Sequence, residues 1–190
     1  KLLINKEYLA LDISPKAILD FNQISNKDSS SRGLVKDFTE KNLNLNDKFD
    51  LILFMGVLHH MTNDLDQVWN NVKKHLNKNG VVVFFEPNAY FLNWLRLIWY
   101  KLSNDFDDEN ERALTATEID YFAEKYNLSL LNSKYIGNLG FFIILQSMIL
   151  RTPKWIKFLT YIPLTYFDLI IENIQSKFLL ATMIRVYINQ

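Results

Sequence analysis

Apolar runs alternate with polar, turn-forming segments in a regular order along the first half of the chain. Short apolar runs typical of strands cover residues 7–13, 33–38, 49–55 and 81–85. Between them, the sequence predicts helices over 16–22 and 65–76. The order strand, helix, strand, strand, helix, strand with short connections predicts a doubly wound α/β sheet with right-handed crossovers.

Three local signals sharpen these boundaries. Ser14 followed by Pro15 is typical of an N-cap and the first helical position. The run Phe49–Met55 is continuously apolar, as expected of a strand covered on both faces in a parallel sheet. Asn77-Lys-Asn-Gly80 predicts the end of the helix over 65–76, with Gly80 supplying the positive φ of the C-cap turn.

Beyond residue 88 the pattern changes to longer apolar stretches rich in aromatic residues. It first predicts a helix over 88–102 and an acidic loop over 104–110. The capping box Thr115-Ala-Thr-Glu118 then opens a helix that ends near Asn127, and a strand over 128–136 follows. The remaining segment predicts helices within 139–180, separated by Pro153 and Pro163, and a closing strand over 181–188. We therefore expect a single domain over 1–190, in which 89–190 add a helical cap and closing strands to the sheet of 1–88.

Composition narrows the class of protein. With 49% hydrophobic residues in 190, the chain can bury a core, which excludes disorder as its main state. Because 21 Lys and Arg balance 21 Asp and Glu, there is no electrostatic footprint for nucleic acid. A Cys count of 0 excludes disulfides and thiolate chemistry, and the chain opens without a signal-peptide pattern, so we expect a cytoplasmic protein.

The apolar second half of the chain is compatible with more than one environment. Its longest apolar stretch, 141–150, is shorter than the roughly 20 residues that a membrane-spanning helix needs. Two helical faces are nevertheless aromatic and aliphatic: Phe91, Trp94, Leu95 and Ile98, and Trp155, Phe158, Leu159 and Ile162. These faces fit core packing of a cap, a lid that admits an apolar acceptor, or peripheral contact with a membrane.

The acid at the end of the first strand is the first candidate for chemistry. In nucleoside-binding α/β folds, such an acid accepts hydrogen bonds from both hydroxyls of a ribose. Asp12 fits this position. An acid before Ser-Pro also favours a helix start electrostatically, so position alone leaves both interpretations open.

Four blocks of the sequence resemble the class I S-adenosylmethionine-dependent methyltransferases, specifically the broad small-molecule group that includes the ubiquinone-pathway enzymes. The blocks span residues 9–15, 35–38, 49–61 and 75–88. The family's usual pattern is an apolar strand ending in "VLHHV", a helix, an "LKPGG" turn and a strand ending in "EP". This chain has Val57-Leu-His-His-Met61 and Glu86-Pro87 at these places, but Asn77-Lys-Asn-Gly80 replaces the Lys-Pro-Gly-Gly turn.

The resemblance implies S-adenosyl-L-methionine as cofactor and assigns its binding residues. Asp12 would hold the ribose and Ile13 would pack on the adenine. Asp37 would accept the adenine amino group, while the backbone N–H of Phe38 meets a ring nitrogen. Met55 and Gly56 would lie beside the methionine part.

On the substrate side, the resemblance implies His59 as the candidate general base, since a free imidazole titrates near neutrality. A helix-start role for His59 stays open. Glu86 would bind a polar substrate group or hydrogen-bond the backbone, and Tyr90 and Trp94 would contact the acceptor. The expected reaction is methyl transfer to a small, hydrophobic acceptor such as a quinone precursor or a lipid.

One departure from the family concerns the start of the chain. The family's first strand and Gly-x-Gly-x-Gly loop precede the Asp12 strand, but only Lys1–Lys6 lie ahead of it here, whereas a βαβ unit takes about 30 residues. Loss of that central strand would expose the edges of both its neighbours. We therefore expect a chain that lacks its N-terminal part and, as it stands, binds cofactor weakly.

Two other functions are compatible with parts of the sequence. Tyr121 and Lys125 match the Tyr-x-x-x-Lys pair of short-chain dehydrogenases, which use NAD. A non-catalytic binding or scaffold module of the same fold also stays open. No metal site is expected, because His59 and His60 are sequence neighbours and cannot both face one ion from a helix.

Overall fold

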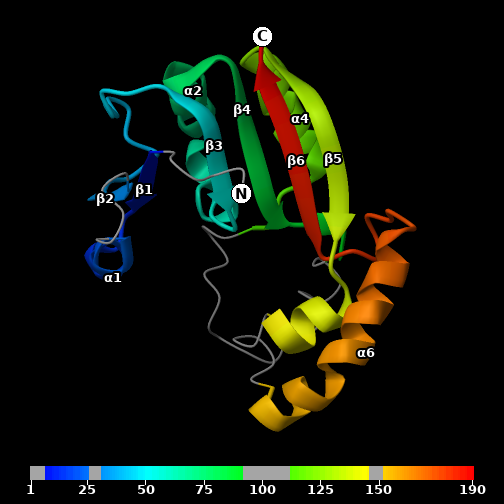
Figure 1. The fold of residues 1–190 in the computed structure, drawn as a ribbon. Coiled ribbons are helices and arrows are strands. Elements are labelled where there is room, and N and C mark those ends of the chain that lie inside the picture. Colours follow the sequence, from blue (N-terminus) through cyan, green and yellow to red (C-terminus); the bar gives the residue numbers. More distant parts are fainter. Residues whose placement is uncertain (1–6, 26–30, 92–111, 146–151) are drawn as a thin grey trace. The chain divides into compact units, whose positions relative to one another are not determined.

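The computed structural model describes residues 7–25, 31–91, 112–145 and 152–190 (Figure 1). The chain forms two compact units, residues 1–45 and 46–190. The first contains β1 (Tyr8–Asp12), α1 (Pro15–Ser25) and β2 (Ser31–Val35). The second contains β3 (Phe49–Met55), η1 (Leu58–His60), η2 (Thr62–Asp64), α2 (Leu65–His75), β4 (Leu76–Pro87), α4 (Ala116–Lys125), β5 (Leu128–Ile136), η3 (Phe141–Leu145), α6 (Lys154–Glu172) and β6 (Thr182–Asn189).

The first unit is a strand–helix–strand unit with parallel pairing. β1 and β2 pair from Tyr8 opposite Ser31 to Asp12 opposite Val35. The α1 side chain of Asn22 accepts the N–H of Gly33 at 2.7 Å. A Cβ on Gly33 would lie 3.1 Å from that same Asn22 oxygen, so glycine permits the close helix–strand approach.

The predicted second strand is displaced along the sequence. Pairing begins at Ser31 and ends at Val35, whereas the sequence pattern placed this strand over 33–38. The difference arises because Ser31 and Arg32 join the ladder despite weak strand propensity. Asp37 therefore follows the strand and does not end it.

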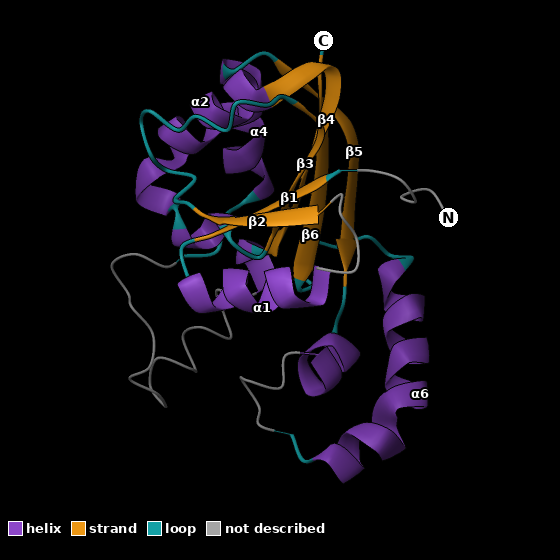
Figure 2. Cartoon of the chain, turned by 60° about the vertical axis from the view of Figure 1, so that its left-hand side comes forward, coloured by secondary structure: helices purple, strands orange, loops and turns teal. Residues whose placement is uncertain are grey.

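The second unit is a four-stranded mixed sheet in the order β3-β4-β6-β5. β3 and β4 are parallel, and β6 runs antiparallel to both β4 and β5. Figures 1 and 2 show α2 and α4 side by side on one face of this sheet. The parallel pair confirms the predicted α/β architecture, and β6 is the predicted closing strand.

Aromatic side chains form the core between α2 and the sheet. Trp69 is fully buried, and its ring centroid lies 4.8 Å from that of Phe84 on β4 and 5.8 Å from that of Tyr187 on β6. Phe54 on β3 stacks on Phe84 at 4.9 Å. Trp69 thereby joins α2 to β4 and β6, and Phe84 extends the contact to β3, which fixes the helix against the sheet.

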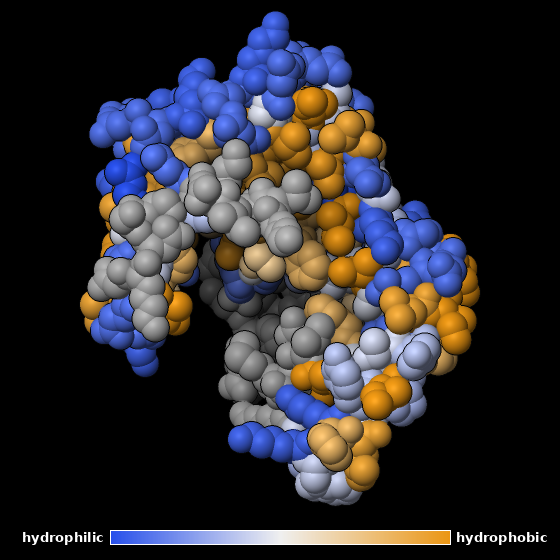
Figure 3. Space-filling model, viewed as in Figure 1, coloured by the Kyte–Doolittle hydropathy of each residue, from blue (hydrophilic) through white to orange (hydrophobic). Residues whose placement is uncertain are grey.

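The opposite face of β3 is exposed among the described residues, which contradicts the prediction of a strand covered on both faces. Leu51, Leu53 and Met55 alternate with inward residues and are 50%, 52% and 63% exposed. The reason is that α2 and α4 lie on the same side of the sheet. Figure 3 shows apolar side chains gathered on the open side over β5 and β6 as well.

Several boundaries were predicted correctly because their signals are local. β3 and β5 have the predicted limits. The capping box is formed: the Glu118 N–H donates to the Thr115 hydroxyl at 3.2 Å, and the Glu118 carboxylate accepts the Thr115 N–H at 2.8 Å. Most of the predicted helix over 88–102, and the acidic loop over 104–110, lie outside the described residues.

The prediction that Pro163 separates two helices is wrong, because α6 continues through it. Proline removes one helical N–H donor and crowds the carbonyl four residues earlier, which can kink a helix without ending it. Here the helix continues on both sides of the exposed Pro163. None of the described helices combines the length and the apolar character that crossing a bilayer requires.

The predicted helix-ending turn over 77–80 is also different: these residues belong to β4, whose pairing with β3 shifts register from Phe49 opposite Leu76 to Leu51 opposite Val81. The positive φ belongs to Asn79, at 62°, and not to Gly80. Gly80 is required for another reason: a Cβ there would lie 2.9 Å from the carbonyl oxygen of Asn77 and 2.9 Å from a methyl carbon of Leu76. Asparagine tolerates the left-handed conformation, so the following glycine is free to serve the close approach.

We therefore expect Gly80→Ala to lower the free energy of unfolding by about 1–3 kcal/mol, because backbone must move to admit the new methyl group. Asn79→Gly should change it by less than about 0.5 kcal/mol, since glycine adopts the same φ without strain. Urea denaturation of both variants checks the pair. A Gly80→Ala variant as stable as the parent would contradict this assignment.

A buried polar cluster joins α4 to β6. Tyr187 is 1% exposed and donates its hydroxyl to Asp120 at 2.5 Å, and the other carboxylate oxygen of Asp120 pairs with Arg185. Burial, and then the hydrogen bond to Asp120, raises the pKa of Tyr187. Because the folded state holds this proton more tightly than the unfolded state, the associated stability is present below about pH 10 and is lost as the pH rises above it.

Tyr187→Phe should therefore weaken the alkaline loss of stability. Above about pH 10 the parent's free energy of unfolding is expected to fall more steeply than that of Tyr187→Phe, by up to about 1.4 kcal/mol per pH unit. Tyr121→Phe is the matched control, since Tyr121 on α4 is 61% exposed. Equal slopes for Tyr187→Phe and the parent would refute the role of this phenol.

Candidate active site

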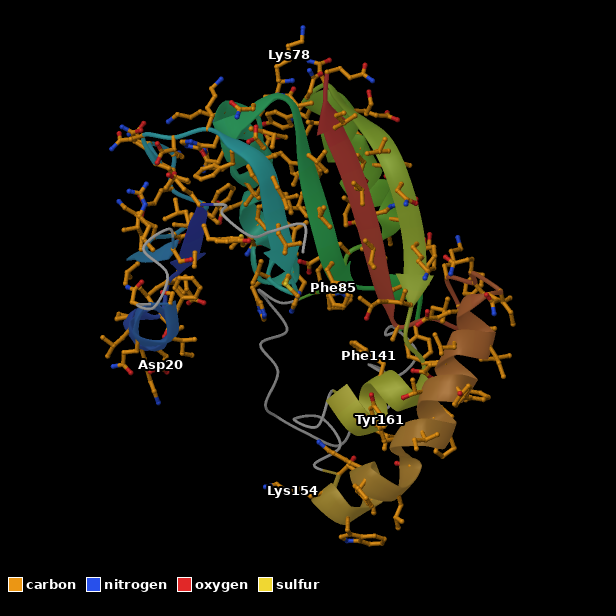
Figure 4. All side chains as sticks on the ribbon, viewed as in Figure 1. Asp20, Lys78, Phe85, Phe141, Lys154 and Tyr161 are labelled. Atoms are coloured by element: carbon orange, nitrogen blue, oxygen red, sulfur yellow. The ribbon has the colours of Figure 1, made fainter. Side chains whose placement is uncertain are left out.

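The chain turns sharply where β3 ends. Gly56 has a φ of +62°, and its N–H donates to the carbonyl of Phe85 at 2.7 Å. Because β3 and β4 are parallel, their carboxyl ends lie at the same edge of the sheet, which Figure 4 marks with Phe85. The loop after Gly56 and the residue after Phe85 therefore meet, and this edge is where open α/β sheets bind ligands.

Glu86 organises this edge. It is fully buried, and one carboxylate oxygen accepts the backbone N–H groups of Val57 at 3.0 Å and Leu58 at 2.9 Å. The other oxygen accepts the N–H of His59 at 3.4 Å and lies 2.9 Å from its Nδ1. The first N–H groups of a helical turn have no partner within the turn, so a carboxylate there supplies what η1 itself cannot.

These contacts bear on the two roles considered for Glu86. The carboxylate hydrogen-bonds backbone groups and His59, and it has no exposed surface. The backbone role is therefore observed, and the substrate-contact role stays a prediction.

His59 combines a fixed ring with partial access. Its side chain is 19% exposed, and its ring centroid lies 3.9 Å from that of His60. A Nδ1–H donated to the Glu86 carboxylate leaves Nε2 of the neutral ring as a proton acceptor. A buried carboxylate that orients an imidazole in this way is the arrangement of a general base.

The two acids predicted for the nucleoside lie at one edge of the first unit. Asp12 ends β1, is exposed, and accepts the N–H of Ser14 at 2.7 Å through Oδ1. The Lys36 N–H donates to the Asp12 carbonyl at 3.1 Å, which brings Asp37 to the same edge. Asp37 accepts the N–H and the hydroxyl of Thr39 at 2.8 and 2.7 Å through Oδ1.

In both acids Oδ1 accepts hydrogen bonds from the local turn, and no described residue hydrogen-bonds the Oδ2 atom. The contact of Asp12 with Ser14 supports the helix-start interpretation, and the remaining oxygen is compatible with a ribose. Among the other predicted cofactor residues, Ile13 is 70% and Met55 63% exposed, while Phe38 is buried. Exposed apolar side chains at strand ends are suited to contact a ligand.

Of the residues predicted for the acceptor, Tyr90 is described and Trp94 lies outside the described residues. The Tyr90 ring meets the ring of Phe178 edge-on at 5.7 Å, and the Lys177 ammonium lies 4.0 Å from the Tyr90 centroid. The buried Asn88 holds this segment by donating to the carbonyl of Lys177 at 2.6 Å. No local sequence signal pairs residues 88–90 with 177–178, so the sequence analysis missed them.

The dehydrogenase pair does not form a proton-transfer site. Lys125 binds Asp66 at 2.5 Å, and that hydrogen bond raises the pKa of Lys125. The same Asp66 accepts the hydroxyl of Tyr126, while Tyr121 is 61% exposed. Among the described residues, no cluster of three or more His, Asp or Glu side chains is arranged to hold a metal ion.

Comparison with known proteins shows which family this arrangement resembles. Residues 1–82 match the family model of a methyltransferase domain, a span that includes Asp12, Asp37, Gly56 and His59. The fold is shared with solved methyltransferases, described below. Over residues 1–82 the chain thus resembles a methyltransferase domain, and its fold is that of S-adenosylmethionine-dependent methyltransferases. The search of curated proteins finds no significant sequence match.

Three solved structures illustrate the likeness. An S-adenosylmethionine-dependent methyltransferase from Clostridium acetobutylicum has a TM-score of 0.62 at 17% identity, covering 96% of this chain and 75% of its own. The N-methyltransferase NodS from Bradyrhizobium japonicum, in complex with S-adenosyl-L-homocysteine, has a TM-score of 0.56 at 14% sequence identity, and the match covers 96% of this chain and 66% of NodS. The O-methyltransferase from a trans-AT PKS multienzyme of Brevibacillus brevis, also with S-adenosyl-L-homocysteine, has a TM-score of 0.57 at 14% sequence identity, and the match covers 95% of this chain and 58% of that chain. At these identities the likeness shows the fold alone.

Glu86→Gln should test how far the site depends on this carboxylate. The amide keeps the size but offers one acceptor oxygen where the carboxylate offers two, so we expect the free energy of unfolding to fall by about 1–3 kcal/mol. The Nδ1 and Nε2 nitrogen shifts of His59 should also change, as read by NMR of the imidazole.

Glu124→Gln is the matched control, because Glu124 is exposed on α4. Its free energy of unfolding should stay within about 0.5 kcal/mol of the parent. If Glu86→Gln is as stable as the parent and leaves the His59 shifts unchanged, Glu86 does not position the turn.

Proposed function

We propose that the chain transfers the methyl group of S-adenosyl-L-methionine to a small acceptor with apolar character. The observation that carries the proposal is the His59–Glu86 pair, whose Nδ1 and carboxylate oxygen lie 2.9 Å apart where the loop after β3 meets β4, in a chain whose residues 1–82 match a methyltransferase-domain model. The S-adenosyl-L-homocysteine bound in the structures of NodS and of the Brevibacillus brevis enzyme supports this choice of cofactor.

The residues of the first unit suit the nucleoside part of that cofactor. The unshared Oδ2 of Asp12 is an acceptor for a ribose hydroxyl, and Ile13 offers exposed apolar surface for adenine. Asp37, at the same edge, would accept the adenine amino group, and Phe38 would offer its backbone N–H. Met55 and Gly56, at the end of β3, would lie beside the methionine part.

When bound, the cofactor supplies an electrophilic methyl group on a sulfonium. The protein's part is to align the acceptor with it, to exclude water and, where the acceptor must lose a proton, to take that proton. His59 Nε2 would accept it, and the Glu86 carboxylate would stabilise the resulting imidazolium across the 2.9 Å contact. The methyl carbon–sulfur bond breaks as the acceptor–carbon bond forms, and the electron pair stays on sulfur.

The apolar character of the acceptor is inferred from the aromatic pair beyond β4. Tyr90, three residues after β4, meets Phe178, which lies between α6 and β6, edge to face, and Lys177 adds one cation. Such a pair favours a flat or greasy acceptor with a polar group, such as a quinol or phenol.

The division of labour between binding and chemistry is testable by calorimetry. Asp12→Ala should weaken S-adenosylhomocysteine binding by about 10- to 100-fold, since it removes a charged acceptor worth about 1.5–3 kcal/mol. His59→Ala should leave that affinity within about 3-fold, but lower transfer of methyl-labelled cofactor to a panel of phenols and quinols by about 100-fold or more. Equal effects of the two substitutions on binding would overturn this division.

The titration should use the protein with any residues that its gene encodes upstream of Lys1, and NADH as the parallel ligand. Saturable binding of S-adenosylhomocysteine alone supports the methyltransferase. Binding of neither ligand points to a scaffold module, and binding of NADH alone returns attention to Tyr121 and Lys125.

A further inference from the structure

A cationic and aromatic cluster lies just beyond the end of β4. We call Tyr90, Lys177 and Phe178 the Lys177 cluster. The Lys177 ammonium lies 4.0 Å from the ring centroid of Tyr90 and 5.3 Å from that of Phe178. The two rings meet edge to face at 5.7 Å. Because a cation within about 6 Å of an aromatic centroid is attracted by the negative face of the ring, both rings help to hold the ammonium in position.

The side chain of Asn88 fixes the backbone on both sides of the Lys177 cluster. Its Nδ2 donates to the carbonyl groups of Lys177 at 2.6 Å and Leu180 at 2.7 Å, and its Oδ1 accepts the N–H of Tyr90 at 3.2 Å. Asn88 is fully buried, so leaving its amide without these partners would be costly. The Lys177 cluster is therefore preorganised, which reduces the ordering that a ligand must pay for on binding.

The Lys177 cluster and His59 are attached to neighbouring positions at the end of β4. Glu86, whose carboxylate lies 2.9 Å from His59 Nδ1, precedes Asn88 by two residues. A two-residue step along an extended chain covers about 7 Å and returns the side chain to the same face. Both residues are fully buried, as that alternation requires. The candidate base and the cluster thus border the same end of the strand.

A second connection runs through residues 112–114. The N–H of Arg112 donates to the carbonyl of His59 at 3.4 Å, and the N–H of Ala89 donates to the carbonyl of Leu114 at 3.2 Å. The turn that contains His59 and the segment that leads to Tyr90 are therefore held on either side of one short stretch of chain.

Lys177 supplies a cation at this edge that no described acid neutralises. The Arg112 guanidinium binds the Glu118 carboxylate at 2.6 Å, and the Glu86 carboxylate accepts backbone N–H groups. By contrast, no described residue forms an ion pair with Lys177, which is half-buried. Aromatic rings attract an ammonium but are poor hydrogen-bond acceptors, so an anionic oxygen group would complete its coordination.

We propose that Lys177 selects a methyl acceptor that carries an anionic oxygen group, a carboxylate or a phosphate, beside an apolar body. The anionic group would accept hydrogen bonds from the Lys177 ammonium, and the apolar body would pack on Phe178, which is 61% exposed. Lys177 is then a specificity-determining residue that takes no part in bond making. The inference deepens the proposed function, because the identification of the ligand as the methyl acceptor rests on it.

Calorimetric titration tests the proposal on the protein with any residues that its gene encodes upstream of Lys1. The probes are 4-hydroxybenzoate, phenyl phosphate and the neutral 4-hydroxybenzamide, each with and without S-adenosylhomocysteine. The parent should bind at least one of the two anions about tenfold or more tightly than the amide, as expected of a charge-assisted hydrogen bond. The anion with the higher affinity identifies the group that Lys177 selects.

Variants at Lys177 separate charge from structural support. Lys177→Gln should abolish the preference for the anion and leave the affinity for 4-hydroxybenzamide within about threefold, since only the charge is lost. Lys177→Arg should keep most of the preference, because the guanidinium retains the positive charge.

Lys78→Gln is the matched control. Lys78 is exposed on β4, and Figure 4 shows it at the opposite end of the sheet from Phe85. This variant should keep the parent's affinity for all three probes. Circular dichroism confirms that each variant is folded.

Two results would overturn the proposal: a parent that binds neither anion more tightly than the amide, or a Lys177→Gln variant that keeps the preference. Failure of the proposed function gives a different result. In that case S-adenosylhomocysteine does not bind, while the Lys177-dependent preference for an anion is still observed. If S-adenosylhomocysteine binds and no preference is observed, the inference about Lys177 alone is wrong.

Discussion

The carboxylate of Glu86 is the interaction on which the candidate active site depends. A buried charge is expensive unless donors surround it, and here three backbone N–H groups and one imidazole do so. The N–H groups of the first turn after β3 in turn need an acceptor from outside the turn. Glu86 lies next to the last residue of β4 and the turn follows β3, so the parallel pairing of these two strands brings the donors and the acceptor together.

Carboxylates that accept backbone N–H groups recur elsewhere in the molecule. Asp168 collects three N–H groups of the turn after β5, Glu118 closes the capping box of α4, and Asp12 and Asp37 each bind the backbone two residues on. In each case a carboxylate fixes a turn that hydrogen bonds within helices and strands leave open. For Glu118, burial acts to raise its pKa, but the hydrogen bonds from Thr115 and the charge of Arg112 hold that pKa below its ordinary value.

Carboxylates also decide which side of α6 packs against the chain. Asp168 and Glu172 accept N–H groups of the turn after β5, so the side of the helix that bears them faces that turn. Elsewhere, Asn88 after β4 donates to the carbonyl of Lys177 after α6, which holds Tyr90 against Phe178.

Signals confined to a short stretch of sequence predict the elements that need no distant partner. The continuous apolar run over 49–55 predicts β3, the three- and four-residue steps predict α2, and the Thr115–Glu118 spacing predicts the start of α4. The motif blocks indicate the resemblance to methyltransferases, and the nucleoside roles of Asp12 and Asp37 stay predictions. The folded structure adds that Asn79 takes the positive φ and that α6 continues through Pro163. It also shows that Glu86 accepts the N–H of Leu58 and contacts His59. Leu58 and Glu86 are 28 positions apart, and a local pattern carries no record of such a partner.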